Sequence, residues 1–150
     1  MSRTTRLRRT IEQHVVLCVD DEPAILSALK RSLRAEPYEV LTTESPESAL
    51  KTVGTRDVSL IITDQRMPGM EGTELLEEIS RCSPSTARII LTAYPGDTIG
   101  RPRLRRWTEC MISKPWDNLM LRKTIRQLLG DRDLDLGQEE VTYERRRGHE

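Results

Sequence analysis

Acidic, hydroxyl and basic side chains stand in this sequence at the points where short apolar runs end. Asp20 and Asp21 directly follow the run VVLCV, while Asp64 and Thr92 end two further runs and Lys114 ends a weaker one. In an open parallel α/β sheet, ligands bind in the crevice at the carboxyl ends of the strands. We therefore expect three carboxylates, one hydroxyl and one ammonium group to meet at a single site.

This set of side chains predicts phosphoryl chemistry assisted by a divalent cation. Three close carboxylates repel one another and raise one another's pKa unless a cation lies among them. A site with oxygen ligands alone suits Mg²⁺, which also accepts phosphate oxygens. A carboxylate beside such a cation can attack phosphorus and form an aspartyl phosphate. The hydroxyl and the ammonium group are natural partners for the phosphoryl oxygens.

Each feature has a simpler structural interpretation when it is taken alone. Acidic residues after a strand are favoured at a helix N-terminus, a Lys-Pro pair is usually a loop, and a threonine at a strand end is mostly structural. Their joint occurrence, in this order and at these strand ends, favours a functional site.

The segments that would position these residues alternate between strand and helix, which predicts a parallel sheet covered by helices on both faces. Pro23 and Pro46 mark the first turns of two helices, and Asp117 is expected to cap the last one. Gly54 and Gly130 are expected to stop the second and the last helix. The predicted strands cover residues 15–19, 38–41, 58–63, 88–91 and 109–113.

Four short motifs resemble those of bacterial response-regulator receiver domains: VDDEP, TDQRMPGMEG, LTAY and SKPWD. The resemblance covers about residues 14–130. It implies a flavodoxin-like, doubly wound, five-stranded parallel sheet in the order 2-1-3-4-5, with helices on both faces. LTAY and KPW further resemble receivers linked to cyclic-dinucleotide phosphodiesterase or transcription-activator modules.

The resemblance implies a role for each residue of the predicted crevice. Asp64 would be the phosphoacceptor, Thr92 the switching hydroxyl and Lys114 the partner of the phosphate, with a cis peptide bond before Pro115. The domain would catalyse only its own phosphorylation and dephosphorylation, and no other enzymatic activity is expected.

The resemblance also implies a magnesium site. Asp21 and Asp64 would bind Mg²⁺ directly, together with the main-chain carbonyl of Arg66. Asp20 would act mainly through water. Mg²⁺ is the one cofactor that we expect.

Two features depart from the receiver pattern. Receivers usually carry an aromatic residue three positions before the lysine, where this chain has Met111, and the chain has no Phe. A thioether can fill the same space, but it cannot act as a flipping ring. Gly100 and Pro102 predict a short or irregular fourth helix. The basic stretch 101–106 is interpreted as a solvated surface, with contact to an acidic partner or RNA as the alternative. Trp107 is the one aromatic residue beside it, which argues against nucleic-acid binding.

The composition fits one receiver domain with charged flanks. Of the 150 residues, 32% are charged and 36% hydrophobic, the formal net charge is zero, and no apolar run is long enough for a membrane span. We expect a basic arm at 1–13, the receiver at 14–130, and a charged tail or linker at 131–150. The three cysteines lack metal-ligand spacing, which favours reduced thiols and a cytoplasmic location. The chain is either a single-domain regulator or part of a longer protein.

Three functions compete. The first is a phosphorylation-dependent switch that accepts its phosphoryl group from a histidine kinase or phosphotransfer protein and acts on a downstream effector. The second is a pseudo-receiver that serves as a constitutive protein-interaction module. Met111 and the irregular fourth helix favour it, whereas the intact acidic pair, Asp64, Thr92 and Lys114 argue against it. The third is an Mg²⁺-dependent phosphohydrolase, which ranks last because neither His14 nor His149 lies near the predicted crevice.

Overall fold

The computed structural model describes residues 10–93 and 108–137, with the main chain alone for 131–137. Its centre is a five-stranded sheet in which every neighbouring pair is parallel, in the order β2-β1-β3-β4-β5. This is the predicted strand order. The strands are β1 (Val15–Val19), β2 (Glu39–Thr43), β3 (Leu60–Asp64), β4 (Ala87–Thr92) and β5 (Cys110–Ser113).

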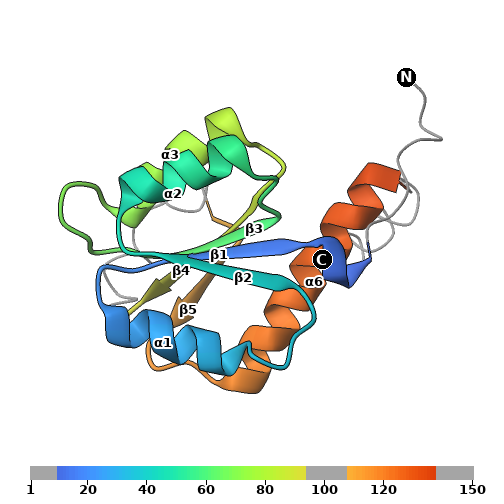
Figure 1. The fold of residues 1–150 in the computed structure, drawn as a ribbon, viewed down its shortest axis with the longest axis horizontal. Coiled ribbons are helices and arrows are strands. Elements are labelled where there is room, and N and C mark those ends of the chain that lie inside the picture. Colours follow the sequence, from blue (N-terminus) through green and yellow to red (C-terminus); the bar gives the residue numbers. More distant parts are fainter. Residues whose placement is uncertain (1–9, 94–107, 138–150) are drawn as a thin grey trace.

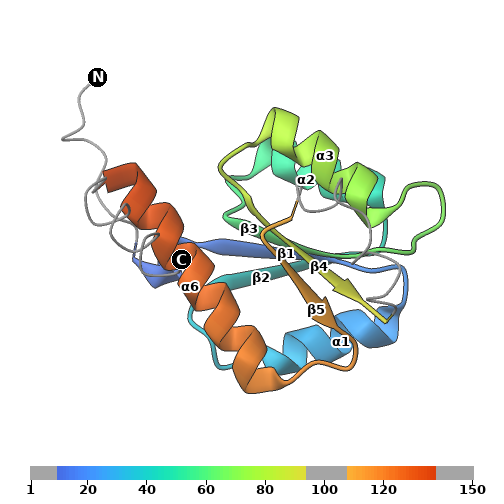
Figure 2. The same ribbon diagram turned by 180° about the vertical axis from the view of Figure 1, so that it is seen from behind.

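Helices cover both faces of the sheet, as predicted. Figures 1 and 2 show α2 and α3 together on one face and α1 and α6 on the other. None of the helices in the described ranges is long and apolar enough to cross a membrane. The helices are α1 (Pro23–Ser32), α2 (Pro46–Thr55), α3 (Gly72–Cys82) and α6 (Asn118–Gly137), and a 3₁₀ turn (Ile11–Gln13) precedes β1.

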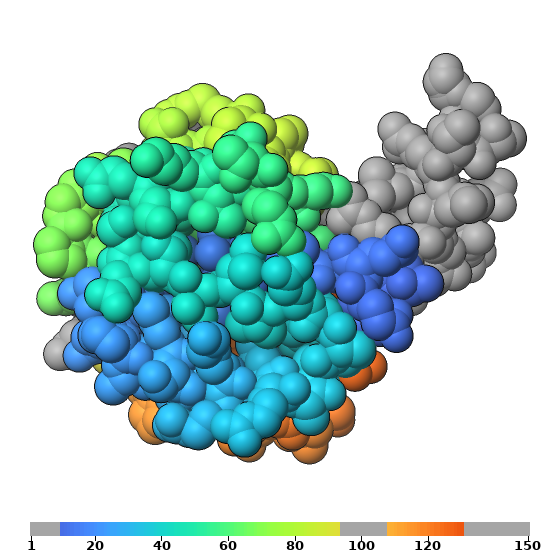
Figure 3. Space-filling model, in the orientation of Figure 1, coloured from blue at the N-terminus to red at the C-terminus, as the bar shows by residue number. Residues whose placement is uncertain are grey.

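The central strands consist of apolar residues because both of their faces are buried. In β1, Val16 and Cys18 join the core beneath α1 and α6, whereas Val15, Leu17 and Val19 join the core beneath α2 and α3. The flanking segments close over most of β1 in the space-filling view (Figure 3). The two apolar layers fix the sheet, and the sheet in turn fixes where its carboxyl ends lie.

The predicted helix starts are confirmed. Pro23 and Pro46 begin α1 and α2, and the Ser45 side chain accepts a hydrogen bond from the Ser48 amide at 3.1 Å. The Asp117 carboxylate accepts one from the Met120 amide at 2.8 Å. These side chains satisfy amides that have no partner inside their own helix.

The predicted helix ends are wrong at both glycines. α2 continues through Gly54 to Thr55, and α6 continues through Gly130 to Gly137. Among the described glycines, Gly69 is the one with a positive φ, so neither Gly54 nor Gly130 adopts the left-handed conformation of a helix stop. A glycine inside a helix costs about 1 kcal/mol, which the surrounding helix can offset. The expected domain boundary at residue 130 therefore falls inside α6.

The remaining differences are shifts of strand ends by one or two residues. The second strand is Glu39–Thr43 rather than 38–41, and the third is Leu60–Asp64 rather than 58–63, so Asp64 is the last residue of β3 itself. The predicted fourth helix and the basic stretch 101–106 lie outside the described residues, as do residues 1–9 of the arm expected at 1–13 and the chain beyond 137, whereas Ile11–Gln13 of that arm form the 3₁₀ turn.

Candidate functional site

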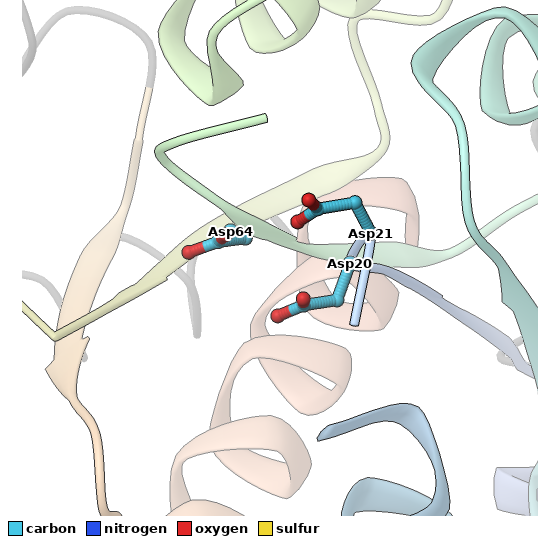
Figure 4. A group of neighbouring side chains, drawn as sticks. All are labelled: Asp20, Asp21 and Asp64. Atoms are coloured by element: carbon cyan, nitrogen blue, oxygen red, sulfur yellow. The ribbon is translucent and has the colours of Figure 1, made fainter. Parts of the chain in front are cut away.

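The carboxyl ends of β1 and β3 bring three aspartates together. One carboxylate oxygen from each of Asp20, Asp21 and Asp64 lies within 4.8 Å of those of the other two. Figure 4 shows the three carboxylates turned to the same side, with Asp20 and Asp21 at the end of β1 and Asp64 at the end of β3. Within the described ranges, no other group of acidic, histidine or cysteine side chains could hold a metal ion in this way.

Lys114, which follows the edge strand β5, completes the cluster at the same edge of the sheet. Its ammonium nitrogen lies 2.9 Å from Asp20 Oδ2 and 3.1 Å from Asp64 Oδ1. Lys114 follows β5, and its peptide bond to Pro115 is cis, as expected. The side chains of Lys114, Asp20 and Asp64 are 11%, 1% and 10% exposed, so the two ion pairs are largely removed from water.

The surroundings of Asp64 disfavour the charged form of its carboxylate. Burial and the charge of Asp20 raise the pKa of Asp64, while Lys114 acts in the opposite direction. Burial lowers the pKa of Lys114, but its hydrogen bonds to Asp20 and Asp64 and their charges outweigh burial and raise it. One ammonium group thus serves at least two buried carboxylates, and an added cation would relieve the excess negative charge.

The oxygen ligands present fit Mg²⁺. Asp20 also accepts a hydrogen bond from the Glu22 amide at 2.9 Å through Oδ1, which fixes its orientation. Asp21 is the most exposed of the three and faces solvent. A hard cation that keeps some of its water suits a site with two buried carboxylates and one exposed carboxylate.

Thr92 is brought to the same edge of the sheet. It is the last residue of β4, is 2% exposed, and is the register partner of Ser113 in β5. Its main-chain oxygen accepts a hydrogen bond from the Lys114 amide at 2.8 Å. Thr92 and Lys114 are therefore tied together through their backbones.

The loop from β3 to α3 passes close to Asp64. A Cβ atom on Gly72 would overlap the main-chain oxygen of Asp64, so only glycine permits this approach. Gly69 has a φ of +86°, which matches the predicted turn. Arg66, whose carbonyl is a predicted metal ligand, is exposed. Gln65 was not among the predicted site residues; it is buried, and its side chain is hydrogen-bonded to Thr73 at the start of α3.

The other predicted positions lie apart from this cluster. His14 is buried at the opposite end of the sheet, where its Nδ1 lies 2.7 Å from the Ser59 hydroxyl. Met111 is partly buried against the core beneath α2 and α3. His149 is outside the described residues. Within the described ranges, His14 therefore does not reach the aspartate cluster.

Comparison with known proteins identifies the family. The model of the response regulator receiver domain matches residues 16–126. The chain belongs to the response-regulator receiver domain family. It is thus a signalling domain of two-component systems, as its motifs indicated.

Solved receiver structures share the fold. A CheY-like response regulator receiver domain protein from Methanospirillum hungatei JF-1 matches with a TM-score of 0.74 and 28% identity, over 82% of this chain and 98% of that one. The response regulator TrrA from Thermotoga maritima, in complex with Mg²⁺-BeF, matches with a TM-score of 0.71 and 32% identity, over 77% and 99%. The flavodoxin-like strand order is therefore confirmed.

Relatives by sequence are longer proteins. The transcriptional regulatory protein GlrR of Escherichia coli K12 is 34% identical over 110 residues, which cover 73% of this chain and 25% of GlrR. The hydrogenase transcriptional regulatory protein HoxA of Cupriavidus necator is 35% identical over 77% of this chain and 24% of HoxA. A cyclic di-GMP phosphodiesterase of Thermotoga maritima is 29% identical over 78% and 31%. The receiver chain thus spans about a quarter to a third of these relatives.

Proposed function

We propose that this receiver is a phosphorylation-dependent switch in which Asp64 accepts the phosphoryl group. The main support for this proposal is that Lys114 lies within hydrogen-bonding distance of both Asp64 and Asp20 at the carboxyl ends of the strands. Asp64 is the carboxylate whose pKa is raised by burial and by a like charge. Such perturbed groups cluster at functional sites.

The carboxylates form the proposed magnesium site. Asp21 and Asp64 would hold Mg²⁺ directly with the main-chain carbonyl of Arg66, and Asp20 would act mainly through water. A bound ion would supply positive charge to neutralise the oxygens of the incoming phosphoryl group. The Mg²⁺-BeF complex of TrrA, which is 32% identical to this chain, supports the choice of metal.

The transfer moves one phosphoryl group between two partners. A carboxylate oxygen of Asp64 forms a bond to phosphorus while the bond from phosphorus to the donor atom breaks, and the bonding electron pair leaves with the donor. Lys114 already lies 3.1 Å from Asp64 Oδ1, so its ammonium group is close enough to bind the new phosphoryl oxygens. The Thr92 hydroxyl would bind another of these oxygens.

The structural response would begin at Thr92. Its main-chain oxygen accepts a hydrogen bond from the Lys114 amide, and its register partner Ser113 lies on the edge strand β5. A shift of Thr92 toward the phosphoryl group would therefore act directly on β5. Met111, on the same strand, replaces the aromatic residue that usually reports this shift, so we expect the response to involve repacking of the thioether rather than a ring flip.

The proposed partners follow from this chemistry. A sensor histidine kinase or a phosphotransfer protein would supply the phosphoryl group. The downstream partner would be an effector domain or protein, and the relatives named as transcriptional regulators and as a cyclic di-GMP phosphodiesterase support these two effector classes.

Incubation with acetyl phosphate tests the proposal. Intact mass spectrometry is expected to show one added phosphoryl group on the wild type in Mg²⁺, none in excess chelator, and none on Asp64→Asn. Glu47→Gln, an exposed change in the first turn of α2, is the matched control and should label like the wild type. Equal labelling of Asp64→Asn would contradict the assignment. No labelling of the wild type in Mg²⁺ would favour a constitutive interaction module instead.

A further inference from the structure

Gln65 directly follows the proposed phosphoacceptor and turns its side chain inward. It is 4% exposed. A buried amide must find hydrogen-bond partners, because leaving its polar atoms unpaired costs about 1–3 kcal/mol. The Gln65 side-chain amide bonds to Thr73, at the start of α3 and at the far end of the loop that Gln65 begins.

Three hydrogen bonds join residue 65 to residues 72 and 73. The Gln65 side-chain Oε1 accepts from the Thr73 amide at 3.0 Å, and its Nε2 donates to the Thr73 hydroxyl at 3.3 Å. The Gln65 main-chain oxygen accepts from the Gly72 amide at 2.9 Å. Thr73 is itself 8% exposed. These hydrogen bonds join the two ends of the segment from Gln65 to Thr73, so the segment forms a closed ring.

The same ring lies against the phosphoacceptor. Gly72 approaches the main-chain oxygen of Asp64 so closely that no side chain fits between them. The loop inside the ring carries Arg66, the proposed main-chain metal ligand. Both ends of that loop are therefore anchored, one by the sheet at Asp64 and the other by the bonds between Gln65 and Thr73.

We propose that Gln65 is a positioning residue for the Asp64 reaction, whose side-chain bridge to Thr73 holds the loop in the shape that binds Mg²⁺. The inference rests on the proposed function and deepens it. The main-chain amide of Gln65 donates a hydrogen bond to the Asp64 carboxylate, which favours its ionised form, whereas the Gln65 side chain bonds to Thr73. The side chain acts through the loop, in the way that groups behind metal ligands orient those ligands.

A purely structural role is the competing explanation, because Thr73 lies in the first turn of α3 and its amide has no partner inside the helix. In that case, loss of the bridge would lower the free energy of unfolding and leave the affinity for Mg²⁺ unchanged. The two roles separate when the metal is titrated well below the unfolding temperature.

The test compares four variants of the whole chain. Gln65→Leu keeps much of the side-chain volume and removes the bridge. Thr73→Val removes the hydroxyl and keeps the amide, whereas Thr73→Ser keeps both. Ser59→Ala is the matched control, since it removes a buried side-chain pair with His14 at the opposite end of β3.

Mg²⁺ binding is measured by calorimetric titration, alongside urea unfolding and acetyl phosphate labelling as a function of Mg²⁺. The half-saturating Mg²⁺ concentration is expected to rise about ten-fold in Gln65→Leu, by less in Thr73→Val, and not at all in Thr73→Ser. Ser59→Ala is expected to unfold more easily and to bind Mg²⁺ like the wild type.

Unchanged Mg²⁺ binding in Gln65→Leu beside a normal wild type would overturn this inference alone. Equal weakening in Ser59→Ala would also overturn it, because the effect would then reflect stability. If Gln65→Leu does not fold, the comparison of Thr73→Val with Thr73→Ser decides. A wild type that neither binds Mg²⁺ nor becomes labelled would overturn the proposed function, and this inference with it.

Discussion

Replacing Lys114 by methionine would remove the one ammonium group that the structure places between Asp20 and Asp64. Methionine is of similar length and apolar, so the change removes charge and hydrogen bonds with little loss of volume. The two carboxylates would then face each other with Asp21 nearby and without the lysine cation. In chelator, where no Mg²⁺ compensates them, we expect Lys114→Met to lower the free energy of unfolding.

The geometry sets the size of the effect. At separations of 2.9 and 3.1 Å, each pair attracts with about 5 kcal/mol at an effective dielectric constant of about 20. The desolvation of Lys114 opposes this attraction, because only 11% of its side chain is exposed. Removing one partner of a buried ion pair typically destabilises by about 3–5 kcal/mol. We expect a loss in this range near neutral pH.

The loss should shrink as the solution is acidified. Burial and Asp20 raise the pKa of Asp64 even with Lys114 present, and removal of the lysine raises it further. An acid with a higher pKa in the folded state binds more protons there than in the unfolded state. The free energy of unfolding therefore falls as the pH rises from the ordinary pKa of the carboxyl group to its raised pKa. Protonation of Asp64 can therefore relieve the repulsion that the missing ammonium group leaves at low pH. The difference in free energy of unfolding between wild type and variant becomes smaller there.

Urea unfolding followed by circular dichroism, in chelator at neutral and mildly acidic pH, measures both effects. Lys51→Met, on the exposed face of α2, is the control and should change the free energy of unfolding by less than about 0.5 kcal/mol. The double variant Lys114→Met with Asp64→Asn should recover part of the loss, because one of the unpaired charges is gone. A Lys114→Met protein as stable as the Lys51→Met control near neutral pH would show that Lys114 does not stabilise the aspartate cluster.

Two further predictions use pairs of matched positions. Gly72→Ala should lower the free energy of unfolding by about 1–3 kcal/mol, because its Cβ would overlap the main-chain oxygen of Asp64; Gly54→Ala, inside α2 with open space around it, should raise it by about 0.5–1 kcal/mol. Equal urea midpoints for the two variants would contradict this. Cys82 is exposed and should react readily with maleimide in the folded protein, whereas Cys18 is buried, with its pKa raised by burial to about 12, and should react only on unfolding. Mass spectrometry of digested samples checks this, and equal rates at both cysteines would show that the β1 core is open.

The fold was predictable wherever apolar runs are buried on both faces of the sheet. The run VVLCV could be little other than a central strand, and Pro23 and Ser45 sit at the helix starts that they indicated. The helix ends were not predictable from glycine alone, because Gly54 and Gly130 remain in helical conformation. Whether a glycine stops a helix depends on the residues beyond it and on the packing of the whole segment.

The core of the site was predictable for a topological reason. Asp20 and Lys114 are 94 residues apart, yet both follow parallel strands, so the sheet had to bring them to one edge. The bridge between Gln65 and Thr73 left no comparable signal. Its bonds depend on the path of one loop, and a glutamine beside a motif does not show whether its amide turns inward or toward solvent.

Chemical mapping of the phosphorylated residue shows directly whether Asp64 is the phosphoacceptor. The protein is incubated with acetyl phosphate and Mg²⁺, the acyl phosphate is reduced with borohydride, and the digested chain is sequenced by mass spectrometry. Reduction converts a phosphorylated aspartate to homoserine and leaves free carboxylates unchanged. We expect homoserine at position 64, with Asp20 and Asp21 intact; homoserine at either of those positions, or at none, would contradict Asp64 as the phosphoacceptor.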